Sequence, residues 1–408
     1  MNNTETIFTQ DIPTTKNPIE IEKLPIENPA AVLTVDVSET ARMLGQKFSA
    51  EVGANIITDF EKTEALYSAG KVDVIDRMVH VSTFVFTGGN IYMTYYANTK
   101  AAAEDPNFQT ARLVYCPADD PETKTFLDVQ SVGDDCYDGK VVMVYDTIMM
   151  QKDENTLFIL WTANISGKYY RLYRIFDIPT KTLGAVQVNR FRVGEVVNDF
   201  STSGIRNALC ENGIGCRKMY SDIGIMQKIT TRVENGETYY YTGAYSGDLN
   251  CIIKSRDFIT WEYVSQPDFP NMSKWENAVY VIGDKCYYFV RQHDETQYGF
   301  LTCYDLVNGT WDTPVLIGDS QSRSDFILYD GQLYLFHAPI DREHLGIVHV
   351  NTEDIAKSEI LLQAKMPSSC FYPFIQYDDK EQLYLSYTVA RQHIRLARFT
   401  MGNYTHGC

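Results

Sequence analysis

The chain has 408 residues, of which 44% are hydrophobic and 22% are charged, so it has material for a sizeable core and too little charge for a disordered protein. Its formal net charge of −17 repels phosphate backbones and anionic lipid, and no run of Lys or Arg supplies a local basic patch. No stretch approaches the roughly 20 apolar residues of a membrane-spanning helix. We therefore expect neither a nucleic acid nor a membrane as a partner.

Metal and cofactor sites have no support in the sequence. The nine cysteines and seven histidines are scattered, and no Cys-x-x-Cys pair occurs. This pattern predicts neither a disulfide framework nor a zinc site, and most cysteines are expected to be buried, reduced thiols. The chemistry inferred below requires no cofactor.

The N-terminal 30 residues are polar, contain four prolines and show no periodicity, which predicts a flexible arm over residues 1–30. They lack the positive segment and the apolar segment of a secretory signal. The expected location is therefore cytoplasmic, or secreted if a leader has been removed from this chain.

A helical extension is expected over residues 31–70. Residues 38–69 form the only long stretch with helical spacing, and Ser38 is a plausible N-cap for it. Such a helix would cap the domain that follows or mediate association.

From residue 71 to residue 408 the texture changes to short runs in which aromatic and β-branched residues alternate with polar ones, separated by Gly, Asn and Asp. This is the pattern of strands and hairpins. The runs repeat, with central aromatic strands at residues 91, 158, 239, 287, 333 and 383. A period near 50 residues predicts a β-propeller blade, so the expected fold is all-β, a six-bladed β-propeller over residues 71–408. A β-sandwich or two stacked β domains is the alternative.

Propellers bind ligands at the axial funnel, where the first strand of each blade delivers its early residues. Five ionisable or phenolic side chains have such positions. Arg77 precedes the first strand of the first repeat, Glu276 and Arg291 bracket a hairpin of the fourth, Arg323 precedes the fifth and Tyr372 precedes the sixth. We expect these groups to converge on one mouth of the propeller.

In this order and spacing, the five residues resemble those of the sialidase (neuraminidase) superfamily of six-bladed propeller glycosidases. The resemblance covers about residues 71 to 400, and two departures mark a divergent member. The family's Arg-Ile-Pro motif is replaced by Arg77-Met-Val-His80, and its Asp-boxes appear only in degraded form, as "SRDFITW" (255–261) and "YDLVNGTW" (304–311).

The resemblance implies an exo-sialidase with a retaining mechanism, acting on the acidic sugars of glycans. Arg77, Arg291 and Arg323 would bind the sugar carboxylate through charge-assisted hydrogen bonds. Tyr372 would be the nucleophile and Glu276 its base, because the same carboxylate repels an anionic nucleophile.

The general acid is expected in the loop that follows the second strand of the first blade. The resemblance favours Asp105 there, with Glu104 beside it, and Asp146 at the start of the second blade is a rival and a substrate contact. His80 and Arg391 are secondary candidates for substrate contact.

Two other functions remain open. A five-bladed propeller of the furanosidase type would use the three carboxylates Asp76, Asp146 and Asp222, and "SRDFITW" also suits such proteins. A non-catalytic glycan-binding propeller would keep the arginine pocket and lack the acid.

Overall fold

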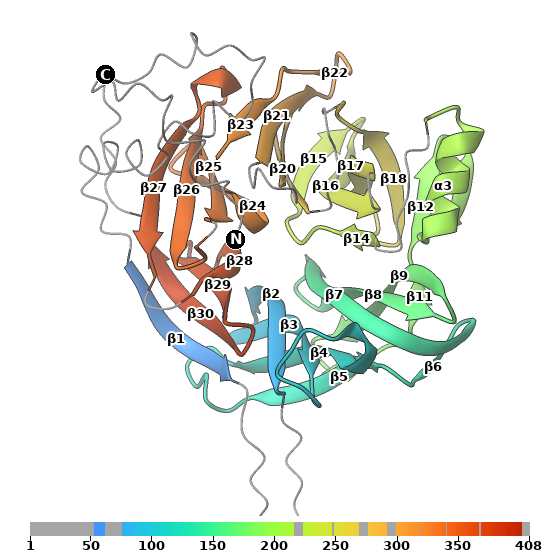
Figure 1. Ribbon diagram of the computed structural model, residues 1–408, viewed down its shortest axis with the longest axis vertical. Helices are drawn as coiled ribbons and strands as arrows, with labels where there is room; N and C mark the ends of the chain where they lie inside the picture. The colour runs from blue at the N-terminus through green and yellow to red at the C-terminus, as the bar shows by residue number, and fades with distance from the viewer. Residues whose placement is uncertain are drawn as a thin grey trace, which may run out of the picture.

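The structure is a computed structural model that describes residues 53–61, 76–215, 223–246, 249–268, 276–291, 299–318, 320–339, 341–366 and 369–401. The described residues form six sheets arranged in a ring around a central axis (Figure 1). Each sheet contacts the next, and the sheet of β28 to β30 contacts that of β2 to β5. The predicted all-β propeller is confirmed, and the β-sandwich alternative is wrong.

We number the sheets 1 to 6 in the chain order of the strands nearest the axis of the ring, and we count the strands of each sheet outward from that strand. Sheets 1 and 2 contain β2 (Met78–Thr87), β3 (Asn90–Asn98), β4 (Gln109–Pro117) and β5 (Thr125–Ser131), then β6 (Asp135–Cys136), β7 (Gly139–Asp153), β8 (Thr156–Ile165), β9 (Lys168–Asp177), β10 (Thr182–Leu183) and β11 (Gln187–Val188). Sheet 3 contains β12 (Arg190–Val193), β13 (Val196–Asp199), β14 (Ile223–Ile225), β15 (Thr230–Glu234), β16 (Glu237–Ser246), β17 (Leu249–Ser255) and β18 (Thr260–Ser265).

The remaining sheets follow the same plan. Sheet 4 contains β19 (Asn277–Ile282), β20 (Lys285–Arg291), β21 (Gly299–Asp305), β22 (Thr310–Trp311) and β23 (Val315–Ile317). Sheets 5 and 6 contain β24 (Gln321–Tyr329), β25 (Gln332–Ala338), β26 (His344–Val350) and β27 (Glu359–Lys365), then β28 (Phe371–Tyr377), β29 (Leu383–Val389), β30 (His393–Thr400) and β1 (Gly53–Glu61). Every aromatic strand used to anchor the sequence repeat lies in the second strand of a sheet: β3, β8, β16, β20, β25 or β29.

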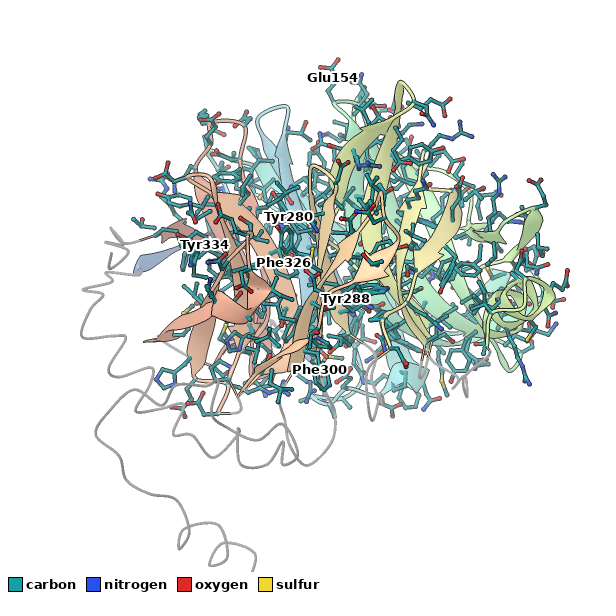
Figure 2. All side chains as sticks on the ribbon, turned by 90° about the horizontal axis from the view of Figure 1, so that it is seen from above. Glu154, Tyr280, Tyr288, Phe300, Phe326 and Tyr334 are labelled. Atoms are coloured by element: carbon teal, nitrogen blue, oxygen red, sulfur yellow. The ribbon has the colours of Figure 1, made fainter. Side chains whose placement is uncertain are left out.

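The core is divided among the interfaces between neighbouring sheets. Six large apolar clusters lie there, one for each pair of adjacent sheets, including the pair that closes the ring. Tyr280 of β19 and Phe326 of β24 illustrate one such interface, with an edge-to-face contact and ring centroids 6.4 Å apart (Figure 2). Burial of apolar side chains at the six interfaces between sheets, and not in one central core, therefore stabilises the ring.

The ring is closed by a strand from the N-terminal part of the chain. β1 pairs antiparallel with β30 from Gly53↔Thr400 to Glu61↔His393. The helix predicted over residues 38–69 is therefore wrong for residues 53–61, where pairing with an available sheet edge overrides a helical apolar spacing. The rest of that segment, like the arm over residues 1–30, lies outside the described residues.

Both degraded Asp-boxes form turns between the third and fourth strands of their sheets. Asp257 accepts hydrogen bonds from the backbone N–H groups of Ile259 and Thr260, at 2.8 and 2.9 Å, between β17 and β18. Asp305 accepts from Val307 and Asn308, at 2.9 and 2.8 Å, between β21 and β22. These residues thus close turns at the edges of the sheets.

Helix is scarce in the described part of the chain. Its one α-helix, α3 (Thr202–Glu211), lies in the long segment between sheets 2 and 3 and starts at the N-cap Ser201, and the two 3₁₀ turns are η2 (Pro106–Phe108) and η3 (Ile355–Lys357). None of these helices is long and apolar enough to cross a membrane. Cys210 of α3 is disulfide-bonded, whereas Cys116, Cys136, Cys251, Cys286, Cys303 and Cys370 are free thiols.

The two faces of the ring are built differently. Figure 2 shows Glu154, in the turn between β7 and β8, at the face opposite to Phe300, the second residue of β21. First strands of the sheets therefore start, and second strands end, at the face that carries Phe300. Glu276, Arg291, Arg323 and Tyr372 lie at these strand ends.

Candidate active site

The candidate site is built on bulges in the first strands. The pairing register shifts between Phe371 and Phe374 in β28 and between Tyr145 and Ile148 in β7. Tyr372 and Asp146 lie at these bulges with left-handed backbone angles, each with a φ of 54°. Matching bulges in β2 and β24 hold Val81 and Ser322. A bulge redirects a side chain out of the alternation of the strand, here toward the axis of the ring.

Glu276 and Arg291 form a buried ion pair at the start of β19 and the end of β20. The Arg291 guanidinium donates from Nη1 to Glu276 Oε2, and the Arg291 backbone N–H donates to the Glu276 carbonyl at 3.1 Å. The two residues are 8% and 5% exposed. Burial alone would raise the pKa of Glu276, but the charges of Arg291 and Arg323 and a hydrogen bond with Tyr372 outweigh it and lower this pKa. Glu276 is therefore an ionised carboxylate that can accept a proton.

Tyr372 lies beside this pair, and its hydroxyl interacts by hydrogen bonding with both Glu276 and Arg291. Burial and the negative charge of Glu276 raise the pKa of the Tyr372 phenol, while the charges of Arg291 and Arg323 act in the opposite direction. The result is a neutral phenol in contact with a carboxylate base. This is the arrangement that a tyrosine nucleophile requires.

Three arginines occupy the same place in three successive sheets. Arg291 ends β20, Arg342 follows the end of β25 and Arg391 follows the end of β29. The guanidinium carbons of Arg342 and Arg391 lie 4.7 and 5.8 Å from the ring centroid of Phe371, the neighbour of Tyr372. Arg342 was missed in the sequence analysis because it follows its strand by four residues, whereas Arg291 ends its strand and Arg391 follows by two.

Glu104 contacts this cluster, and Asp105 has other partners. Glu104 accepts a hydrogen bond from the Tyr96 hydroxyl at 2.6 Å, and its Oε2 lies 3.0 Å from Nε of Arg391. Asp105 caps η2 and accepts from the backbone and side-chain nitrogens of Asn107, at 3.0 and 2.8 Å. The loop thus directs the Glu104 carboxylate to Tyr96 and Arg391 and leaves the Asp105 carboxylate in a turn.

Arg323 lies deeper than the three strand-end arginines. It is 2% exposed, and its Nη2 donates to Oδ1 of Asp146 and lies 3.6 Å from Oε1 of Glu276. The other carboxylate oxygen of Asp146 accepts from Nη1 of the buried Arg171 at 3.1 Å. Sequence analysis identified Arg323 and Asp146 as substrate contacts, but their burial and mutual pairing make them the floor of the site. Arg171, which the sequence analysis missed, has no sequence pattern that distinguishes it from other strand arginines.

His80 and Arg77 have opposite environments. His80 is 1% exposed, its two ring nitrogens have no hydrogen-bond partner, and its ring packs edge-to-face on Tyr372 at 4.4 Å between centroids. Burial, together with the positive charges of Arg391 and Arg323, lowers its pKa well below the usual value. Arg77 is exposed, and its side chain forms no hydrogen bond or ion pair with the described residues. The structure thus brings His80 against Tyr372 and leaves Arg77 outside the cluster.

The cluster has an excess of positive charge. Among the described residues, five arginines (Arg171, Arg291, Arg323, Arg342 and Arg391) accompany three carboxylates (Glu104, Asp146 and Glu276), which leaves two positive charges in excess. No described carboxylate lies within ion-pair distance of Arg342. In a chain with a net charge of −17, this is a local site for an anion.

The two described carboxylates of the furanosidase hypothesis, Asp76 and Asp146, have different arginine partners. Asp76 accepts from Nε and Nη2 of Arg112, at 2.8 and 2.7 Å, within sheet 1. Asp146 belongs to the floor of the site, and Asp222 lies outside the described residues. Within the described part of the chain, no three His, Cys, Asp or Glu side chains are grouped so that they could hold a metal ion.

Comparisons with known proteins find relatives by structure only. No family model and no curated protein matches the sequence. Among solved structures, the Trypanosoma rangeli sialidase in complex with sialic acid is 13% identical over 86% of this chain, with a TM-score of 0.54, and a Hadza microbial sialidase is 11% identical over 79%, with a TM-score of 0.53. The chain spans 59% of the length of the first and 66% of the second. At this identity the likeness establishes a sialidase-like propeller fold.

Proposed function

We propose that the protein is a glycoside hydrolase of the sialidase type, an exo-enzyme that releases a terminal sialic acid or a related 2-keto acidic sugar from glycans with retention of configuration. The observation that carries this proposal is the contact of the Tyr372 hydroxyl with Glu276 beside an excess of arginine charge. A sugar with a carboxylate on its anomeric carbon needs both features. The fold shared with sialidases supports the same assignment.

The anion-binding part of the mechanism falls to the strand-end arginines. Arg291, Arg342 and Arg391 would hold the substrate carboxylate through charge-assisted hydrogen bonds and fix the sugar ring over Tyr372. This set replaces Arg77 and Arg323 of the sequence-based assignment, because Arg77 lies outside the cluster and Arg323 is already paired with Asp146.

The covalent part has two steps. Tyr372 attacks the anomeric carbon while Glu276 takes the phenolic proton, and the glycosidic oxygen leaves with a proton from a general acid. Water then attacks the tyrosyl-linked sugar and gives a proton to the group that acted as acid, the Tyr372 oxygen recovers its proton from Glu276, and the free sugar is released. The described contacts support Glu104 as this acid, since it bonds to Tyr96 and its charge acts on the pKa of Tyr372, whereas Asp105 is engaged in a turn with Asn107.

The first test is hydrolysis of a 4-methylumbelliferyl α-sialoside, with arabinofuranoside and galactoside analogues in parallel. We expect release from the sialoside alone, and a loss of at least roughly 10³-fold in kcat for Tyr372→Phe. Tyr377→Phe is the matched control, because it removes a hydroxyl from the same strand that only donates to the Leu328 carbonyl at 2.9 Å. Release from the furanoside would overturn the proposal in favour of a carboxylate mechanism, and binding of sialic acid without turnover would favour a glycan-binding protein.

A second test distinguishes the two neighbouring acids. Glu104→Gln is expected to lower kcat by roughly 10² to 10⁴-fold on a sialyl-galactoside and much less on the 4-methylumbelliferyl substrate, whose leaving group needs little protonation. Asp105→Asn, one residue away, is expected to leave both rates within about threefold of the native enzyme because it affects a turn. The reverse pattern would restore the sequence-based assignment of Asp105.

A further inference from the structure

One buried guanidinium, that of Arg323, approaches residues from four other sheets or from segments adjoining them. It belongs to β24 of sheet 5, donates to Asp146 of sheet 2, and lies 3.4 Å from Oε1 of Gln227, between β14 and β15 of sheet 3. Glu276, directly before sheet 4, lies 3.6 Å away, and the ring centroid of Tyr372, in sheet 6, is 5.5 Å from its central carbon. Sheets 2 and 5 face each other across the ring (Figure 1), so the Arg323–Asp146 ion pair crosses the axis.

This position separates Arg323 from the arginines that can reach a ligand. A guanidinium that is 2% exposed, with one carboxylate bonded to it and a second within ion-pair distance, has little surface to offer a substrate. Its charge is nevertheless permanent. Burial disfavours the charged form, but the charges of Asp146 and Glu276 more than compensate and raise the pKa of Arg323.

The two groups of the proposed chemistry both lie against this charge. Arg323 is the second arginine, after Arg291, that lowers the pKa of Glu276. It also opposes the rise in the pKa of the Tyr372 phenol that burial and Glu276 produce. A fixed cation beside both groups favours the ionised base and eases loss of the phenolic proton.

We propose that Arg323 is a positioning residue, held across the axis by Asp146, that fixes Glu276 and keeps a positive charge against Tyr372 without binding the substrate. This inference rests on the proposed function, because it assigns Tyr372 as the nucleophile. It predicts that Arg323 acts on turnover, whereas Arg342 acts on substrate affinity.

The kinetic test compares Arg323→Met with Arg342→Met. Arg323→Met is expected to lower kcat by roughly tenfold to a hundredfold, the effect of one to two units in a pKa, with KM and the affinity for free sialic acid within about threefold of the native values. Arg342→Met should instead raise KM and weaken the binding of free sialic acid, with little change in kcat. A rise in KM with unchanged kcat in Arg323→Met would make Arg323 a substrate ligand and overturn the inference.

A second measurement needs no substrate. Tetranitromethane nitrates phenolates, so the rate of nitration at Tyr372, followed by peptide mass spectrometry from pH 8 to about pH 10.5, reports loss of its proton, with the 67% exposed Tyr137 as internal reference. Arg323→Met should slow nitration of Tyr372 by at least roughly tenfold relative to Tyr137. Unchanged nitration would refute the inference, whether or not the protein cleaves a sialoside. Absence of sialoside cleavage, with slower nitration in Arg323→Met, would refute the proposed function alone.

A double variant serves as the control in case Arg323→Met does not fold. If Arg323→Met is unfolded, as judged by circular dichroism and thermal melting, Arg323→Met is combined with Asp146→Asn, which removes both charges of the cross-axis pair and keeps an amide oxygen that can accept from Arg171. The double variant should fold and show the same loss of kcat and slower nitration. A folded double variant with native kcat would overturn the inference.

Discussion

Arg323 and Arg342 both act electrostatically on the same tyrosine, but the protein holds them in opposite ways. Arg323 is buried, bonded to one carboxylate and within ion-pair distance of a second. Arg342 is partly exposed, stacks on Phe371 at 4.7 Å and has no described carboxylate within ion-pair distance. A charge that is already neutralised in the interior belongs to the scaffold, whereas an unpaired charge at the mouth of a funnel is available to a ligand. The charged cluster therefore has two layers, a buried and paired floor (Arg171, Arg323 and Asp146) and a partly exposed rim (Arg342, Arg391 and Glu104).

Removal of the carboxylate of the floor, Asp146, is expected to have the largest effect on stability. Asp146→Leu leaves the guanidinium groups of Arg171 and Arg323 buried without their shared partner, and such a loss costs roughly 3–5 kcal/mol of unfolding free energy. Urea unfolding of the variant and the native protein measures the difference. The matched change at the rim, Glu104→Gln, should cost less than about 1 kcal/mol, because exposed pairs contribute little. Equal losses at the two positions would show that the floor and the rim are not distinct.

The rim is tested by removing its unpaired arginine. Arg342→Met should weaken binding of free sialic acid by about 1.5–3 kcal/mol, or roughly 10- to 150-fold, the usual contribution of a charge-assisted hydrogen bond. Isothermal calorimetry measures this affinity. The unfolding free energy should stay within about 0.5 kcal/mol of the native value, since no described carboxylate loses its partner.

Arg342→Lys is the control for charge. It keeps the positive charge and loses the planar fork, so it should retain part of the affinity. An Arg342→Met protein that binds sialic acid as tightly as the native chain would exclude Arg342 from the site.

The two layers were not equally accessible to sequence analysis. Strand periodicity located the second strands, and the spacing between Glu276 and Arg291 identified a pair that the structure brings together. Burial was not visible in the sequence, so sequence analysis could not distinguish Arg323, which is buried and paired with Asp146, from an arginine that faces a ligand. Arg342 was missed because it follows its strand by four residues, whereas Arg291 is the last residue of β20.

Backbone conformation explains further differences. The bulge that holds Tyr372 at a φ of 54° leaves no mark in the amino-acid pattern, because aromatic residues rarely adopt this conformation. The strand over residues 53–61 was taken for helix although Ile56, Ile57 and Thr58 are three consecutive β-branched residues. Its strand state depends on pairing with β30, more than 330 residues further along the chain, and no local pattern contains that information.

The pH dependence of activity also tests the role of the floor, because Arg323 acts together with Arg291 to lower the pKa of the proposed base, Glu276. Glu276 must be ionised to accept the phenolic proton, and its pKa is lowered below the ordinary value of 4.5. The acid limb of kcat/KM should therefore have its midpoint below pH 4.5, and Arg323→Met should move it upward by roughly one unit, or about 1.4 kcal/mol. Initial rates between pH 3.5 and about pH 8 test this.

The same pH profile tests whether His80 stays neutral. The pH dependence of stability follows from the lowered pKa of Glu276. The pKa of His80 lies well below 6.5, so it stays neutral and no inflection near pH 6.5 is expected from it. Because the pKa of Glu276 is depressed on folding, its contribution to stability is full above the unfolded value of 4.5 and is lost as the pH falls through its folded pKa. An acid limb centred near pH 6.5 would contradict this account.

The smallest expected effect concerns the ion pair of the rim. Arg391 and Glu104 have side chains that are 42% and 35% exposed, with Nε and Oε2 3.0 Å apart. Solvent screens such a pair, so Arg391→Gln should change the unfolding free energy by only about 0.2–1 kcal/mol, and less at high salt. Urea unfolding at low and high sodium chloride measures both values. A loss comparable to that of Asp146→Leu would place Arg391 in the scaffold and leave Arg291 and Arg342 alone to hold the substrate carboxylate.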